Sequence, residues 1–378
     1  MTFSKTWRRR WRRPQHEIII VAAGSSIVPL VVVDGSQSST EWVGKRWARS
    51  AGFPEASASQ PQPVTIALIN NMPDAALEDT ELQFFELLNH AAGNIPVNLE
   101  LYSLPGIPRS ERGQKHLTNF YSGIDDLLNS RFDGVIVTGT EPIHSDLREE
   151  PYWSILTSVL DWAERNTTST VLSCLAAHAG VLYSDGIPRH RLADKQFGVF
   201  DYKKNRSHSL TQHIEEAVQT PHSRWNEVQE DALVACGYDV LTSSARGGVN
   251  SFVKKKRNSL FVHFQGHPEY GTQTLLKEYR RDIKRFLRRE RETYPATPVG
   301  YFNASITRLL AEFQNNVLYD AREEQMALFP EGVIVETLSN SWAPWATDLY
   351  RNWLQYLLSR KLDNSSPVAV SRSLHSLR

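Results

Sequence analysis

The sequence is poor in cysteine, with only Cys174 and Cys236 in 378 residues. Two thiols cannot form the disulfide framework of small secreted domains, so a reducing compartment fits and we expect a cytoplasmic protein. Net charge is also missing, because 42 Lys and Arg residues balance 42 Asp and Glu residues. A chain without net charge has no overall attraction to nucleic acid, and we expect no nucleic-acid partner.

The sequence also lacks an uninterrupted apolar run of the roughly 20 residues that a membrane-spanning helix needs. The nearest candidate, residues 18–33, follows a basic stretch at residues 8–13, but glycine and proline interrupt it. A stretch rich in Ser, Gln and Pro at residues 57–63 resembles a linker. We therefore expect no membrane partner, and we interpret residues 1–62 as a dispensable, poorly ordered leader and linker and residues 361–378 as a flexible tail.

A phosphate-binding glycine loop and an internal repeat are absent, but strand and helix patterns alternate from residue 63 to residue 360. The strand-like segments are residues 64–69, 97–102, 134–137, 232–241, 248–253 and 260–264. The helix-like segments are residues 78–91, 116–128, 152–164 and 272–292. This alternation predicts a single α/β domain with a doubly wound, mostly parallel sheet, whose active site lies at the carboxyl ends of the strands. A charge run at residues 254–257 indicates a hairpin tip.

Cys174 lies where a buried strand, residues 170–172, runs into a small, apolar helix at residues 175–182. A cysteine at such a turn faces the positive end of the helix dipole, which favours the nucleophilic thiolate. This is the geometry of a nucleophile elbow, although the flanking glycines of the esterase version are missing. Cys236 lies in a strand-like run and is expected in the core.

His267 and Glu269 follow the strand-like residues 260–264 and a Gly turn. A histidine just beyond a strand, with a carboxylate two residues later, can serve as a general base oriented by an acid. Cys174, His267 and Glu269 would then form a catalytic triad assembled from separate segments.

Fourteen short motifs, in a fixed order, resemble those of the homoserine O-acyltransferases of methionine biosynthesis, the homoserine O-succinyltransferase family. They occur at residues 70–73, 119–121, 132–139, 152–153, 168–170, 186–188, 195, 198–199, 221–224, 266–270, 273–275, 281–282, 352–354 and 356. The elbow and the Gly-His-Pro-Glu-Tyr motif at 266–270 also resemble the class I glutamine amidotransferase-like fold, a flavodoxin-like three-layer architecture. Many motifs in the right order are far more specific than any one of them.

The resemblance implies acyl transfer from an acyl-CoA co-substrate to homoserine, by a ping-pong route through an acyl-enzyme on cysteine. It implies no permanently bound cofactor and no metal, and it is compatible with a homodimer. The residues that it carries over are the catalytic Cys174, His267 and Glu269, the oxyanion donors Leu175 and Ile143, the substrate-binding Lys195, Ser223 and Arg281, and the donor-specificity positions Glu141 and Ile143.

The sequence departs from the family in two places near the expected acyl-donor site. Residues 74–76 are Asp-Ala-Ala, where familiar members carry lysines. Pro142, which cannot donate a hydrogen bond, falls at the family's oxyanion-donor position, so Ile143 or Glu141 has to donate or the loop has to shift. A carboxylate in this loop accompanies acetyl-CoA use in the family, and Glu141 lies two positions before the expected site. Succinyl-CoA and acetyl-CoA both remain open as donors.

Several alternatives remain. His178, four residues after Cys174, is a rival base, and the pair His263 and His267 suggests a metal, although no third ligand lies nearby. The same triad could serve a glutamine amidotransferase-type hydrolase, or an acyltransferase for a related hydroxy amino acid such as serine. A non-catalytic regulatory role would not require all three triad residues. The basic helix at residues 272–292 could be a nucleic-acid face, but it lacks interleaved aromatic residues.

Overall fold

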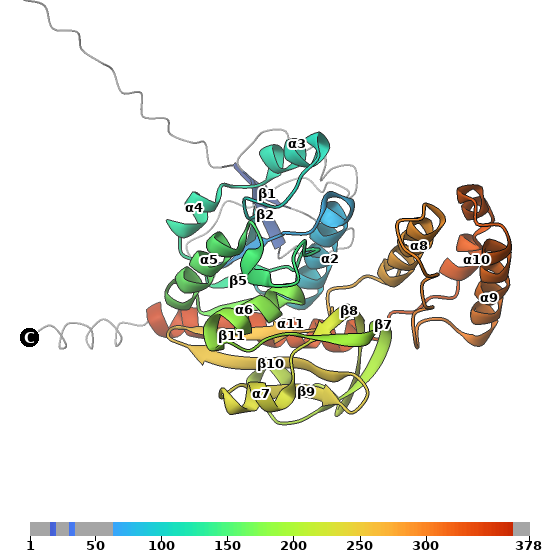
Figure 1. The fold of residues 1–378 in the computed structure, drawn as a ribbon. Coiled ribbons are helices and arrows are strands. Elements are labelled where there is room, and N and C mark those ends of the chain that lie inside the picture. Colours follow the sequence, from blue (N-terminus) through green and yellow to red (C-terminus); the bar gives the residue numbers. More distant parts are fainter. Residues whose placement is uncertain (1–15, 20–29, 35–62, 366–378) are drawn as a thin grey trace, which may run out of the picture.

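One mixed sheet runs through the part of the chain that the structure describes (Figure 1). The computed structural model describes residues 16–19, 30–34 and 63–365, with side chains for residues 63–363. The strands of this part lie in the spatial order β1 (His16–Ile19), β2 (Leu30–Asp34), β4 (Val97–Tyr102), β3 (Val64–Ile69), β5 (Gly134–Val137), β6 (Ser169–Ser173), β11 (Ser259–Phe264), β10 (Gly248–Lys256), β9 (Asp239–Ser244), β7 (His190–Lys204) and β8 (Ala217–Glu227).

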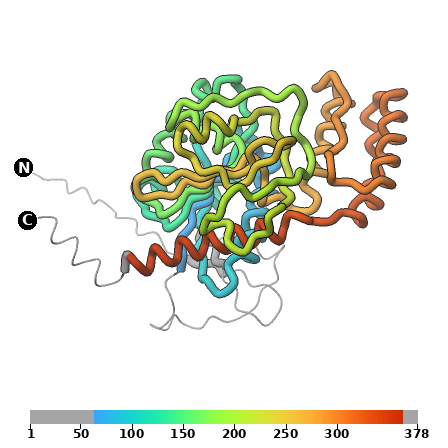
Figure 2. Tube along the Cα trace, turned by 90° about the horizontal axis from the view of Figure 1, so that it is seen from below, coloured from blue at the N-terminus to red at the C-terminus, as the bar shows by residue number. Residues whose placement is uncertain are grey.

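The strands from β2 to β11 in this order are parallel to one another. β5, β6 and β11 are buried along their whole length, as expected where helices cover both faces of a parallel sheet. One face packs on α2 (Asp74–Ala92) and α11 (Ala343–Ser365), and α11 crosses beneath the sheet in Figure 2. The other face packs on α4 (Ile124–Leu128), α5 (Trp153–Asn166) and α6 (Leu175–Asp185). The prediction of a doubly wound α/β sheet is confirmed.

Beyond β11 the sheet continues with antiparallel pairs, from β11 through β10, β9 and β7 to β8. The hairpin between β10 and β11 turns at Arg257, which adopts φ 47°, as the charge run at residues 254–257 predicted. This half brings β8 beside the carboxyl end of β11, where the N–H of His267 donates to the carbonyl of Pro221. The antiparallel half therefore supplies one wall of the site.

A lobe of helices stands beside the sheet in Figure 1: α8 (Thr274–Leu287), α9 (Ala304–Tyr319), the short 3-10 helix η3 (Glu323–Leu328) and α10 (Glu331–Val335). The apolar residues of α8, including Tyr279 and Ile283, are buried in the same core cluster as apolar residues of α9 and α10. The basic residues of α8 consequently lie on the face of this helix that points away from the core cluster. The sequence predicted a helix at residues 272–292, and α8 is shorter at both ends.

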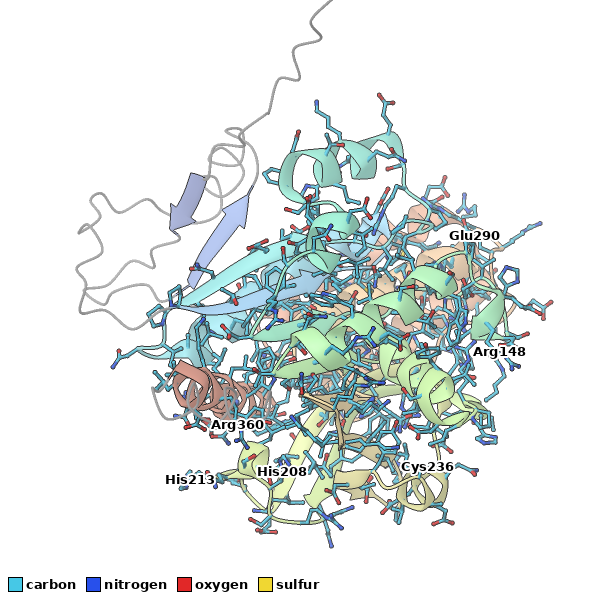
Figure 3. The ribbon with its side chains drawn as sticks, turned by 90° about the vertical axis from the view of Figure 1, so that its left-hand side faces the viewer. Arg148, His208, His213, Cys236, Glu290 and Arg360 are labelled. Atoms are coloured by element: carbon cyan, nitrogen blue, oxygen red, sulfur yellow. The ribbon has the colours of Figure 1, made fainter. Side chains whose placement is uncertain are left out.

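Residues 232–241 do not form the strand that their apolar pattern predicted. They contain the end of α7 (Glu230–Ala235), a turn, and the start of β9. Two acidic residues in the first turn of α7 suit a helix N-terminus, and Gly237 with φ 78° permits the turn that follows. Cys236 caps the helix, is half-buried, and is labelled in Figure 3.

The helix predicted at residues 116–128 is two helices, α3 (Glu111–Phe120) and α4, because the chain between them is extended and Ser122 forms a β-bridge with Tyr102. The predicted boundary after residue 62 and the predicted tail at 361–378 stay predictions. Of residues 1–62 the structure describes β1 and β2, and β2 pairs with β4; the remainder lies outside the described residues. None of the helices in the described ranges is long and apolar enough to cross a membrane.

Candidate active site

Cys174 occupies the sharp turn between β6 and α6, as its sequence position predicted. Its backbone adopts φ 52° and ψ −110°, a left-handed φ that a residue with a side chain rarely takes and that costs about 1–3 kcal/mol. Its N–H donates to the carbonyl of Phe264 at the end of β11, over 2.7 Å. The two neighbouring strands thus fix the turn, and the half-buried thiol lies at the N-terminus of α6.

His267 follows β11 after a turn at Gly266 that only glycine fits. A Cβ at residue 266 would lie 2.6 Å from Nε2 of His222 and 2.6 Å from the methyl carbon of Thr220. The His267 N–H donates to the carbonyl of Pro221 over 2.9 Å, which ties this turn to β8. The close approach of β8 therefore sets where the imidazole lies.

His267 and Glu269 form a buried pair, with 2.9 Å between Nδ1 and Oε1 and side-chain exposures of 10% and 5%. Burial alone would lower the pKa of His267. The negative charges of Cys174 and Glu269, with hydrogen bonds to both, nevertheless raise that pKa well above its usual value. The three predicted triad residues are therefore brought together, because Cys174 and Glu269 are both hydrogen-bond partners of the His267 side chain.

Two residues that support the pair were not predicted from the sequence. Ser173, the last residue of β6, donates its hydroxyl to Glu269 Oε1 over 3.0 Å. The ring of Tyr270 stacks on His267 with 4.2 Å between centroids. Tyr270 lay in the recognised 266–270 motif, but no pattern indicated Ser173, because the contact joins residues 96 positions apart.

The two predicted oxyanion positions differ in their surroundings. The Leu175 N–H opens α6 directly after the nucleophile, and a Cβ at Gly139 would lie 3.1 Å from that nitrogen. The loop after β5 thus approaches Leu175 at Gly139. The Ile143 N–H instead donates to Oε1 of Glu150 over 2.8 Å, and its side chain is 62% exposed. Its oxyanion role stays a prediction that requires Glu150 to release this donor.

Lys195, Ser223 and Arg281 converge on two acidic residues of α8, Glu278 and Asp282; we name these five residues the α8 cluster. Lys195 Nζ lies 3.2 Å from Asp282, and Arg281 lies 2.9 Å from the same carboxylate. The Ser223 hydroxyl donates to Glu278, and both cations lie 3.8 Å from that carboxylate.

The α8 cluster connects to the triad through Tyr270, whose hydroxyl donates to Glu278 Oε1 over 2.5 Å. The residues that the resemblance carried over as substrate contacts are therefore neighbours of each other and of His267. Sequence reasoning missed Glu278 entirely. Its only signal was its helical spacing, three residues before Arg281.

Glu141 points to α8 and pairs with Arg285, with Nη1 and Nη2 lying 3.2 Å and 3.3 Å from its carboxylate oxygens. Its side chain is 58% exposed. The carboxylate is thus screened by water and partly compensated by the guanidinium. Its expected role in donor choice stays a prediction.

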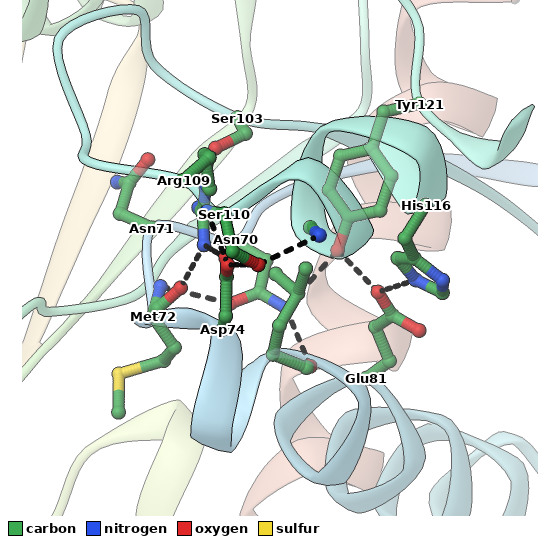
Figure 4. A network of polar contacts seen from close by, with 12 residues as sticks. Asn70, Asn71, Met72, Asp74, Glu81, Ser103, Arg109, Ser110, His116 and Tyr121 are labelled. Atoms are coloured by element: carbon green, nitrogen blue, oxygen red, sulfur yellow. Dashed lines mark hydrogen bonds and ion pairs between the residues drawn. The ribbon is translucent and has the colours of Figure 1, made fainter. Parts of the chain in front are cut away.

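The Asn-Asn-Met-Pro motif at residues 70–73 forms hydrogen bonds that hold neighbouring segments of the chain in place (Figure 4). The Asn70 amide donates to Leu77 and Tyr121, over 3.0 Å and 3.1 Å. The Asn71 N–H donates to the hydroxyl of Thr138, the residue before Gly139, over 2.8 Å. The motif therefore holds the base of the loop that reaches Leu175.

Asp74, the first residue of the 74–76 stretch that was noted as a departure, pairs with Arg109 at 3.2 Å and accepts the Ser110 N–H at 2.7 Å (Figure 4). Partial burial works against ionisation, but the hydrogen bonds from Ser110 and the charge of Arg109 lower the pKa of Asp74. This departure from the family therefore has a local structural function.

The rival histidines are both buried. His178 lies 2.8 Å from Oε1 of Gln265, and burial lowers its pKa to about 3. His263 stacks on Phe252 with 4.6 Å between centroids, and burial lowers its pKa to about 3 as well. Within the described ranges no three metal-ligating side chains gather to hold an ion. Neither histidine is placed to exchange protons with a substrate.

A family model described as Homoserine O-succinyltransferase matches residues 43–363. The Homoserine O-succinyltransferase of Bradyrhizobium japonicum is 44% identical over 301 residues, which cover 79% of this chain and 92% of that protein. Its namesake from Rhodopseudomonas palustris is 42% identical over 296 residues, covering 78% and 89%. The crystal structure of a glutamine amidotransferase from Thermotoga maritima is 11% identical, with a TM-score of 0.42, and covers 79% of this chain and 99% of that one.

Proposed function

The chain belongs to the homoserine O-succinyltransferase family, and from this premise we propose that it transfers an acyl group from a coenzyme A thioester to the hydroxyl of homoserine. The observation that carries the proposal is the arrangement of the half-buried Cys174 with the buried His267 and Glu269 at the end of two parallel strands. The acyl group passes through a covalent thioester on Cys174.

In the first half-reaction the Cys174 thiolate attacks the carbonyl carbon of the acyl-CoA thioester. The carbonyl oxygen becomes an oxyanion, which the Leu175 N–H stabilises from the start of α6. Collapse breaks the bond to the coenzyme A sulfur, and His267 gives its proton to that leaving thiolate. The raised pKa of His267 supports this acid role, because it favours the protonated imidazole.

Acylation removes the negative charge of Cys174, which is one of the charges that raise the pKa of His267. The burial of the imidazole then weighs more heavily, and the pKa of His267 falls. The second half-reaction needs a neutral imidazole to take the proton of the homoserine hydroxyl. The alkoxide oxygen attacks the acyl-enzyme carbonyl, the bond to Cys174 breaks, and the thiolate is restored. The same residue thus serves as acid and then as base.

The α8 cluster suits an amino-acid acceptor. Homoserine carries a carboxylate, and the Arg281 guanidinium, 44% exposed, offers a planar fork for it. The ammonium group of homoserine needs an anionic partner, and the carboxylate of Glu278 or Asp282 supplies it. Lys195 and Ser223 hold these carboxylates in place. An acceptor bound there lies next to Tyr270 and hence to His267.

We propose succinyl-CoA as the donor, as the names of the relatives suggest. Glu141 does not oppose this choice, because it is exposed and paired with Arg285. Steady-state rates with succinyl-CoA and acetyl-CoA test the proposal. We expect kcat/KM to be higher for succinyl-CoA, and Glu141→Ala to change that preference less than about 3-fold, as befits a screened charge. A preference for acetyl-CoA that Glu141→Ala reverses would contradict both statements.

The acyl-enzyme is tested by incubating the protein with succinyl-CoA in the absence of homoserine and measuring its intact mass. We expect one succinyl adduct on Cys174, which disappears when homoserine is added and yields O-succinylhomoserine. Cys236→Ala is the matched control, and it should still form the adduct. Release of ammonia from glutamine without adduct formation would replace the proposal with a hydrolase.

A further inference from the structure

The exposed face of α8 carries a basic stripe, of which the proposed chemistry uses only Arg281. A groove of about 310 Å³ on this face is lined by six cations and one carboxylate: Lys277, Arg280, Arg281, Lys284, Arg285, Arg288 and Glu290. Spacings of three and four residues put the cations on one side of the helix. The other side, with Tyr279 and Ile283, is buried in the lobe.

The groove shares a residue with the surroundings of the triad. Arg281 lines the groove and also belongs to the α8 cluster, whose Glu278 accepts the Tyr270 hydroxyl. Arg285 reaches Glu141, in the loop that approaches Leu175 at Gly139. From Arg281 to Arg288 the helix leads away from the site for about 10 Å, at 1.5 Å per residue. A ligand with one end at Cys174 and a long arm would pass along this face.

The cations of the stripe can exchange their partners. Arg285 and Arg288 pair with Glu141 and Glu323, carboxylates that are 58% and 47% exposed. Such exposed pairs contribute only about 0–1 kcal/mol each, so a multiply charged anion can replace them. Lys284 is exposed and forms no ion pair with any residue in the described ranges.

We propose that the basic stripe binds the phosphate groups at the nucleotide end of acyl-CoA, with Lys284, Arg285 and Arg288 as the contacts. The nucleotide end carries a diphosphate and a 3′-phosphate, a dense negative charge, and several cations along a helix match an extended row of phosphates. The flexible pantetheine arm joins this end to the thioester at Cys174. The inference rests on the proposed function, because it presumes a coenzyme A donor.

The stripe is tested by comparing two donors that share the acyl group and the pantetheine arm, succinyl-CoA and succinyl-pantetheine, of which only the first has the nucleotide end. We expect Lys284→Glu to lower the ratio of their kcat/KM values about 10-fold, because the charge is reversed beside the phosphates. Added salt should lower the same ratio in the wild type. The matched control is Arg308→Glu, an exposed cation of the neighbouring helix α9, which should leave the ratio unchanged.

A binding measurement separates this inference from the proposed function. Calorimetry with adenosine 3′,5′-bisphosphate, which has no acyl group, should give a Kd that Lys284→Glu raises about 10-fold and Arg308→Glu leaves unchanged. This result would support the nucleotide site even if the wild type transferred no acyl group from either donor.

If homoserine acylation proceeds while Lys284→Glu changes neither the donor ratio nor this Kd, the inference is wrong and the proposed function stands. Displacement of the bisphosphate by a lower concentration of single-stranded oligonucleotide would also overturn it, in favour of a nucleic-acid face.

Discussion

The proposed catalytic triad and the α8 cluster are neighbours, but they are held in place in different ways. The triad side chains of His267 and Glu269 are 10% and 5% exposed, and backbone fixes them: a left-handed residue at Cys174 and a turn that only glycine permits. In the α8 cluster, two cations and a hydroxyl share two carboxylates of a helix, and Arg281 is 44% exposed.

The difference fits the two tasks that we propose for these regions. A nucleophile and its base have to meet in the same geometry at every turnover, so buried backbone contacts that cannot rearrange suit them. A binding site has to release its own internal partners when a charged ligand arrives. Ion pairs near the surface allow this exchange at low cost, because water compensates the separated charges.

The largest effect on activity is expected from removing Cys174, the proposed nucleophile. Cys174→Ala should lower kcat by about 10⁴-fold or more, because no other group can carry the acyl chain. The fold should survive, since alanine needs less space in the same turn, and circular dichroism and thermal unfolding check this. Cys236→Ala should retain full activity. Residual transfer within about 100-fold of wild type would exclude the covalent route.

The triad should respond unequally to loss of its other members. His267→Asn removes the proton carrier, and we expect a decrease in kcat of about 10³- to 10⁴-fold. Glu269→Gln keeps a hydrogen-bond partner for the imidazole, and we expect a decrease of about 10- to 100-fold. Steady-state kinetics measure both. If Glu269→Gln were the more damaging change, Glu269 would move protons itself instead of orienting His267.

For the α8 cluster, Arg281→Lys replaces a planar fork with a point charge. We expect kcat/KM for homoserine to fall about 10- to 100-fold, mainly through KM, while the KM for succinyl-CoA changes little. Arg351→Lys is the matched control, because Arg351 is 41% exposed and also pairs with a carboxylate three residues away. An unchanged KM for homoserine in Arg281→Lys would place the acceptor elsewhere.

The charge coupling within the triad has a spectroscopic test. Because the pKa of His267 is raised in the folded protein, its proton stabilises the fold fully below about pH 6.5, the usual histidine pKa, and this contribution is lost as the pH rises through the raised value. Nitrogen NMR of His267 should show imidazolium at pH 7.5. In Cys174→Ala the proton should leave at lower pH, because the thiolate charge is gone. Identical titrations would mean that the thiolate does not hold the proton.

The smallest effect is expected from deleting residues 1–62. All residues of the proposed triad and of the α8 cluster lie C-terminal to residue 138, and hence outside the deleted part. Activity should stay within about 2-fold of wild type, and the truncated protein should remain soluble, although β4 loses its partner β2 and becomes a sheet edge. Size-exclusion chromatography and a rate assay measure the result. Aggregation would show that β2 is part of the domain and that the predicted boundary is wrong.

Sequence patterns located the triad because each member follows a strand, and strands with continuous apolar runs are easy to recognise. Local periodicity could not distinguish the short helix α7 from a strand, since an apolar run of five residues fits both. The partners that tune the site lay beyond sequence reasoning. Ser173 meets Glu269, and Ser223 meets Glu278, across 96 and 55 positions, and only folding brings such pairs together.

The last helix that the structure describes, α11, contacts the sheet at residues that lie much earlier in the sequence. The Trp353 indole donates to the hydroxyl of Ser169, at the start of β6, across 184 positions, and Lys361 contacts Asp133 and the carbonyl of Pro63 across 228 and 298. During synthesis the strand that leads to Cys174 therefore keeps one face uncovered until residues 343–365 have left the ribosome. Contacts of such long sequence separation slow folding. A nascent chain stalled before residue 343 would expose the apolar face that α11 covers, and chaperones that bind such surfaces would be its first partners in the cell.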